Sequence, residues 1–179
     1  MIRFLPLVMA ANIFLSGCSS VVPTGVARLA NVSPLTADPG AFAVALTLPD
    51  GLEVVEGSAR IRFAAMRRDT QAESQATYVL RAAQVGERTL YRVDPVDLAR
   101  FRAQQDLIKS WQAENEEATS GSFAVDLEAC KRGDGPALDA KVSVAMQTRP
   151  DQPFFDIVRN APVARILRDA TEAHIGPCS

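Results

Sequence analysis

Cysteine and histidine, which often act as nucleophiles, proton carriers or zinc ligands, are rare in this 179-residue chain. There are three cysteines and one histidine, scattered singly along the sequence: Cys18, Cys130, Cys178 and His174. Nucleophilic catalysis needs a base beside the nucleophile, and a zinc site needs several Cys or His at close spacing. The adjacent carboxylates Glu116 and Glu117 lie in a polar stretch, which indicates a solvated helix end. The sequence therefore predicts a protein that is not an enzyme and that holds no metal or cofactor.

Cys18 closes an N-terminal segment that has the layout of a secretory signal. Arg3 precedes an apolar run over residues 4–14, and Leu15-Ser16-Gly17 leads up to the cysteine. A charged start, a short apolar stretch and small residues before the cleavage site are the three parts of such a signal. The apolar run is too short for a membrane-spanning helix, which needs roughly 20 apolar residues.

The stretch Leu15-Ser16-Gly17-Cys18 resembles the lipobox of bacterial lipoprotein precursors. The resemblance implies cleavage before Cys18, a diacylglyceryl thioether on its sulfur and acylation of the new amino terminus. It divides the chain into a signal peptide (1–17), a lipidated N-terminus with a flexible tether (18–40) and a globular domain (41–179). Pro, Gly and Ser recur in the tether, which ends at the turn signal Asp38-Pro39-Gly40. A plain signal peptide and a transmembrane helix are the alternatives.

Secretion would place the two remaining cysteines in an oxidising compartment. An even number of cysteines there predicts a disulfide, here between Cys130 and Cys178. In the chain-entropy model, a bridge across a loop of this length contributes at most about 4 kcal/mol to stability. Two free thiols are the alternative.

The composition limits the classes of function. Hydrophobic residues make up 47% of the chain and charged residues 22%, as in an ordinary globular protein of one domain. The formal net charge of −2 at pH 7 argues against nucleic-acid binding, which needs a strongly basic surface.

Six arginines could together form a basic stripe on a sheet. They are Arg60, Arg62, Arg67, Arg68, Arg81 and Arg92. The planar guanidinium group binds phosphate and carboxylate through two hydrogen bonds at once. The stripe therefore predicts a dock for an anionic lipid, a lipopolysaccharide phosphate or an acidic envelope protein. The alternative is an ordinary solvated sheet face.

Alternation of apolar and polar residues predicts six strands. Their ranges are 42–48, 59–66, 76–82, 89–93, 123–129 and 140–147. The last two of these are expected to pair with each other as antiparallel neighbours.

Between the fourth and fifth strands the apolar spacing becomes helical. Asp94 suits a helix N-cap and Pro95 the first helical position. Apolar residues then recur along one face, with Gln105 filling the gap in their stripe, and a helix is predicted over about 95–115. Short helices are predicted at the chain end, one over 154–158 and one that restarts at Pro162.

These elements favour a mostly β protein, an antiparallel β-sandwich with one inserted helix and short C-terminal helices; an α+β two-layer fold is the alternative. The predicted function is a non-enzymatic binding or structural module, anchored in the bacterial envelope through lipid on Cys18. Ser19 after that cysteine favours the outer membrane, with the domain facing the periplasm. A periplasmic carrier of a small apolar ligand or lipid is the alternative function.

Overall fold

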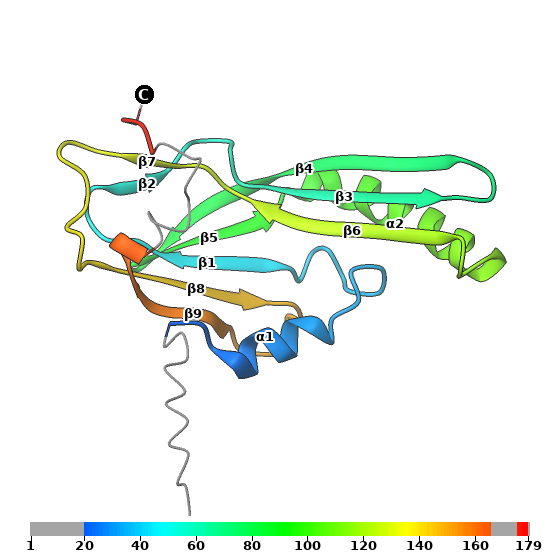
Figure 1. Cartoon of the computed structure of the whole chain (residues 1–179), viewed down its shortest axis with the longest axis horizontal. Helices are drawn as coiled ribbons and strands as arrows, with labels where there is room; N and C mark the ends of the chain where they lie inside the picture. Colours follow the sequence, from blue (N-terminus) through cyan, green and yellow to red (C-terminus); the bar gives the residue numbers. More distant parts are fainter. Residues whose placement is uncertain (1–19, 166–174, 179) are drawn as a thin grey trace, which may run out of the picture.

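The computed structural model describes residues 20–165 and 175–178. Cys18, the signal segment and His174 lie outside these residues. Strands are the predominant regular elements of the fold (Figure 1). In chain order, the elements are α1 (Pro23–Ala30), β1 (Ala43–Thr47), β2 (Leu52–Val54), β3 (Arg60–Arg67), β4 (Ala72–Val85), β5 (Arg88–Val93), η1 (Pro95–Asp97), α2 (Leu98–Glu114), β6 (Thr119–Asp126), β7 (Ala129–Lys131), β8 (Lys141–Gln147) and β9 (Phe155–Pro162).

Seven of the strands form one antiparallel sheet in the order β6-β3-β4-β5-β1-β8-β9, and β2 and β7 form a small second sheet. The long strand β4 belongs to both halves of the large sheet. Its first part, 72–79, pairs with β3, and its second part, 80–85, pairs with β5. The halves β6-β3-β4 and β4-β5-β1-β8-β9 are therefore continuous through one strand.

The large sheet curls, so that its two halves face each other across the core. Phe42, next to β1, contacts Phe123 on β6 with ring centroids 5.8 Å apart, although three strands separate β1 from β6 in the sheet order. The mostly β, antiparallel fold with one inserted helix is thus as predicted. Both layers come from one curled sheet instead of two separate large sheets.

Helix α2 forms where the sequence predicts it and covers the apolar side of the sheet. The Asp94 side chain accepts a hydrogen bond from the backbone N–H of Val96 at 3.1 Å, which starts η1 and then α2. The side of α2 that faces the sheet is buried: Phe101, Gln104, Gln105, Ile108 and Trp111. The Phe101 ring lies 4.5 Å from that of Tyr78. Each fully buried aromatic or aliphatic side chain of this kind contributes about 2 kcal/mol.

A buried polar network joins α2 to the sheet. The Tyr78 hydroxyl, on a side chain with no exposed surface, donates to Gln104 Oε1 at 2.7 Å. Gln104 Nε2 in turn donates to the Phe63 carbonyl at 3.0 Å and to Ser74 Oγ at 3.1 Å. The network satisfies polar groups that would destabilise the core if they were left unpaired.

The described part of the predicted tether, residues 20–40, is folded, so this prediction was wrong there. Ser20 to Val22 pair with β9: the N–H of Val22 donates to the Ile157 carbonyl at 2.9 Å, and the N–H of Arg159 donates to the Ser20 carbonyl at 2.7 Å. Helix α1 follows directly. Its proline stands in the first turn, where a missing N–H costs nothing, and therefore does not break the helix.

Gly25 does not break α1 either. It faces β9 so closely that a Cβ there would overlap the Asp156 carbonyl oxygen. The glycine allows the helix to lie directly on the strand.

Two predictions about the C-terminal part were also wrong. Residues 155–162 form the strand β9, paired with β8, where a helix was expected over 154–158. A short apolar run fits both periods, and the free edge of β8 decides in favour of a strand. The expected pairing of the last two predicted strands does not occur either, because β6 pairs with β3 while β8 lies between β1 and β9. Helical residues do follow β9 at 163–165, and the rest of that predicted helix lies outside the described residues.

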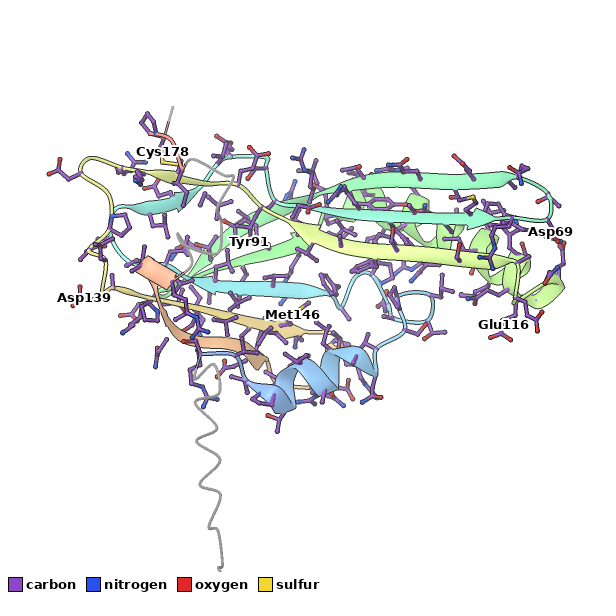
Figure 2. The ribbon with its side chains drawn as sticks, in the orientation of Figure 1. Asp69, Tyr91, Glu116, Asp139, Met146 and Cys178 are labelled. Carbon is purple, nitrogen blue, oxygen red and sulfur yellow. A yellow bond between two sulfur atoms is a disulfide. The ribbon has the colours of Figure 1, made fainter. Side chains whose placement is uncertain are left out.

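A disulfide joins Cys130 on β7 to Cys178, as predicted, with Cα atoms 4.9 Å apart (Figure 2). Backbone hydrogen bonds accompany it. Lys131 donates to the Gly176 carbonyl and accepts from the N–H of Cys178, both at 2.8 Å. The C-terminal residues 175–178 are therefore fastened along β7.

We predict that Cys178→Ser lowers the free energy of unfolding, by up to about 4 kcal/mol, because the unfolded chain gains the freedom of an open loop. Urea denaturation measures the change. The double variant Cys130→Ser/Cys178→Ser should lose the same amount, since one bond is lost in both. Two reactive thiols in the unreduced wild-type protein would contradict the bridge.

Candidate functional site

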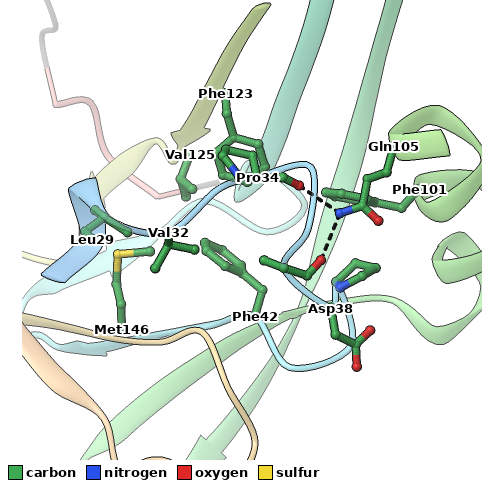
Figure 3. Close-up of a pocket in the computed structure, with 12 residues that line it drawn as sticks. Leu29, Val32, Pro34, Asp38, Phe42, Phe101, Gln105, Phe123, Val125 and Met146 are labelled. Atoms are coloured by element: carbon green, nitrogen blue, oxygen red, sulfur yellow. Dashed lines mark hydrogen bonds between the residues drawn. The ribbon is translucent and has the colours of Figure 1, made fainter. Parts of the chain in front are cut away.

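A cavity of about 340 Å³ lies between α2, β6, β8 and the segment that connects α1 to β1 (Figure 3). Twelve residues line it: Leu29, Val32, Pro34, Ala37, Asp38, Pro39, Phe42, Phe101, Gln105, Phe123, Val125 and Met146. Most of them are apolar. The strands and α2 form its walls, and residues 31–42, which we call the cover segment, close one side.

Asp38 is the one charged residue among the twelve, and its carboxylate points away from the cavity (Figure 3). It forms an ion pair with Arg102, with Nη2 and Oδ1 2.9 Å apart, and accepts from the N–H of Gly40 at 3.1 Å. The hydrogen bond from Arg102 is the main cause that holds the pKa of Asp38 below its usual value. The ionised carboxylate of Asp38 thus lies toward the outer surface, and the side of the residue that faces the cavity is uncharged.

Gln105 fastens the cover segment to α2. Its amide nitrogen donates to the Pro34 carbonyl at 2.7 Å and to the Ala37 carbonyl at 2.8 Å (Figure 3). The side chain is 4% exposed. Gln105 fills the gap in the apolar stripe of α2. It therefore also holds the cover segment against the helix on this side of the cavity.

Two turns shape the cover segment. The N–H groups of Thr36 and Ala37 both donate to the Ser33 carbonyl. The N–H of Ala41 donates to the Asp38 carbonyl, so the predicted turn at Asp38-Pro39-Gly40 is present. Proline at the first and glycine at the second central position suit such a turn.

The sequence analysis missed the part of the cavity formed by residues before β1. Leu29 and Val32 line the cavity, and Leu29 and Leu35 pack against the main core. These three residues are three positions apart, a spacing that could have indicated a buried helical face in the supposed tether.

The six arginines do not form one free basic surface. Arg60, Arg62, Arg81 and Arg92 lie on the outer face of the sheet, because Arg60 is opposite Val79 on β4 and Arg81 is opposite Arg92 on β5. Three of them pair with carboxylates. Arg60 lies 2.8 Å from Glu128, Arg62 lies 2.9 Å from Asp126, and Arg81 lies 3.3 Å from Asp94.

These pairs neutralise most of the expected stripe. The hydrogen bond from Arg62 lowers the pKa of Asp126, and the ionised carboxylate offsets the charge of the arginine. Arg92 donates to Gln147 Oε1 at 3.3 Å across the buried Ala43, which lies between them in the sheet. The outer face therefore resembles a solvated sheet surface more than an anion dock.

Arg67 and Arg68 lie at the other end of β3 and hold the chain around the end of α2. Arg67, whose side chain is 13% exposed, pairs with Asp69 at 2.9 Å and with Glu114. These two carboxylates raise its pKa, Asp69 being the larger cause. Arg68 donates to the Glu117 carbonyl. Both arginines thus have structural partners.

The remaining candidates are the two adjacent carboxylates and His174, which lies outside the described residues. Glu116 (Figure 2) and its neighbour Glu117 are exposed beyond the end of α2, as predicted. Residues 20–165 and 175–178 hold no cluster of Cys, His, Asp or Glu that could bind a metal ion. No helix within them combines the length and apolar character needed to cross a membrane.

Comparison with known proteins adds no relative: no family model, no curated protein and no solved structure matches the chain. The candidate site is therefore argued from geometry alone, and this cavity is chosen for its apolar lining.

We predict that Gln105→Ala lowers the free energy of unfolding by about 1–3 kcal/mol, because two carbonyl groups of the cover segment lose their donor. Urea denaturation gives the stability, and hydrogen exchange of residues 33–42 should become faster. Gln112→Ala is the matched control, since Gln112 is an exposed residue of the same helix. Equal stability and equal exchange in the two variants would contradict this role of Gln105.

Proposed function

We propose that the protein is a lipid-anchored module of the bacterial envelope that binds a small apolar ligand without catalysis. The observation that carries the proposal is the apolar cavity of about 340 Å³. Ligand sites are typically concave, mostly apolar and about 300–1,000 Å³ in volume. A cavity at the lower end of this range suits a small apolar molecule or one acyl chain.

Packing energetics supports an occupant. Protein interiors are as densely packed as organic crystals, and in core variants a void destabilises the fold by about 24 cal/mol for each Å³. The mostly apolar space between α2, β6, β8 and the cover segment would likewise be stabilised by an apolar molecule that fills it. The lining offers such a molecule dispersion contacts, and the inward-facing rings of Phe42, Phe101 and Phe123 supply much of that surface.

The second candidate, an interaction module for an anionic partner, has less support. The surface predicted for such a partner is the arginine stripe, and three of the four outer-face arginines are paired with carboxylates. A partner would have to separate these pairs before it could bind the guanidinium groups.

The anchor rests on the lipobox-like stretch that ends at Cys18. Two acyl chains on this sulfur, and a third on the amino group, would hold the protein at a membrane without spanning it. Ser20, the first described residue, is paired with β9, so the folded domain begins directly after the proposed anchor.

We predict that the mature protein begins at Cys18 and carries diacylglycerol on its sulfur. Mass spectrometry of the N-terminal peptide detects the added mass. Cys18→Ser should leave the leader uncut and the acyl mass absent. A mature protein that is fully soluble and unacylated would contradict the anchor.

We predict that a fatty acid with a photoreactive diazirine crosslinks to the cavity lining of the mature protein in lipid nanodiscs, and that Val125→Phe reduces this labelling. The added ring fills space beside Phe123, and a loss of about 1.4 kcal/mol in binding lowers affinity tenfold. Peptide mass spectrometry locates the label.

Val79→Phe is the matched control, because Val79 is a strand residue with 49% of its surface exposed. Its labelling should equal that of the wild type. Labelling outside the cavity, or equal labelling in both variants, would show that the cavity is not the ligand site.

A further inference from the structure

The outward side of α1 is unusually apolar for the surface of a folded domain. Val26 is 43% exposed, and Val21, just before the helix, is 45% exposed. Pro23, Ala27 and Ala30 are exposed beside them. The helix carries no acidic residue, and its one charged residue is Arg28. A helix on the surface of a soluble domain normally turns charged and polar residues outward.

The inward side of α1 packs against the rest of the domain. Gly25 is buried against the Asp156 carbonyl, and Leu29 packs against the main core. Helix α1 lies along β9 at the edge of the sheet (Figure 1). The apolar outward side is therefore not explained by packing within the chain.

The proposed lipid on Cys18 would hold the outward side of α1 close to a membrane. Ser20 is two residues from Cys18, so no more than about 7 Å of extended chain separates it from the proposed lipid attachment. Ser20 and Val22 are fixed to β9 by hydrogen bonds to Arg159 and Ile157, which leaves little freedom for α1 to swing away from the lipid surface.

Arg28, the charged residue of α1, also suits a position beside a lipid surface. The Arg28 guanidinium lies 4.8 Å from the centre of the Phe155 ring and donates to Gln152 Oε1 at 2.6 Å. Among the described residues, the hydrogen-bonding partner of Arg28 is thus a neutral amide, which does not offset the positive charge of the arginine. An apolar strip with an arginine at its side is the pattern of a helix that lies at the boundary between headgroups and acyl chains.

We propose that α1 is a membrane-contact helix, which lies on the phospholipid surface with Val21 and Val26 turned toward the lipid. The inference rests on the proposed anchoring at Cys18 and extends it from a single attachment point to a fixed orientation of the domain.

A fluorescent label on residue 26 tests the orientation. In Val26→Cys the new thiol is the one available for labelling, because Cys18 carries lipid and Cys130 is bonded to Cys178. The lipidated protein is labelled with the environment-sensitive dye NBD and reconstituted into vesicles of phosphatidylethanolamine and phosphatidylglycerol. We expect a blue-shifted emission that lipids with nitroxide headgroups quench.

Val79→Cys is the control, since Val79 is exposed to a similar degree on β4, which three strands separate from β9. Its label should emit as in water and resist quenching. Flotation of the vesicles in the same samples measures anchoring. A protein that floats while both labels behave alike overturns the orientation of α1 and leaves the anchor intact. A protein that does not float overturns the anchor and, with it, this inference.

Discussion

Aromatic packing between α2 and the curled sheet determines the rest of the structure. Phe101 of α2 lies against Tyr78 on β4, Phe63 on β3 and Phe123 on β6, with ring centroids 4.5, 5.7 and 6.5 Å away. Phe123 also contacts Phe42, next to β1. Each such contact contributes about 1 kcal/mol beyond the area that it buries. The cluster thus holds both halves of the sheet to one helix and sets how far the sheet curls.

The same helix organises the polar groups of the interior. Gln104 and Gln105 are neighbours in the sequence but serve two different elements. The first binds the Tyr78 hydroxyl and the carbonyl of Phe63, and the second binds two carbonyl groups of the cover segment. Because α2 fixes both the sheet and the cover segment, it defines the cavity between them. The candidate site is therefore a consequence of how this helix is held.

The sequence predicts those parts of the fold that depend on local patterns. Alternation locates β1, β3, β5 and β8 and parts of β4 and β6, and the Asp94-Pro95 cap together with the apolar stripe locates α2. The small strands β2 and β7 were missed, as were α1 and β9. The last two depend on each other, because α1 and the residues before it contact the backbone of β9, far away in the sequence. The arginine pairs could not be predicted for the same reason, since Arg60 and Glu128 are 68 positions apart. Half of the cavity lining follows from core residues of α2, β6, β8 and the residue just before β1, and the other half belongs to the segment interpreted as a tether.

Native mass spectrometry of the protein extracted from its own membrane tests the central claim most directly, namely that the cavity between α2, β6, β8 and the cover segment holds an apolar ligand. The account predicts one non-covalent apolar molecule for each protein, in addition to the covalent lipid, and its loss after extraction with organic solvent. A protein that always leaves the membrane with its covalent lipid alone, and whose crystal structure shows the cavity filled by its own side chains, would contradict the claim.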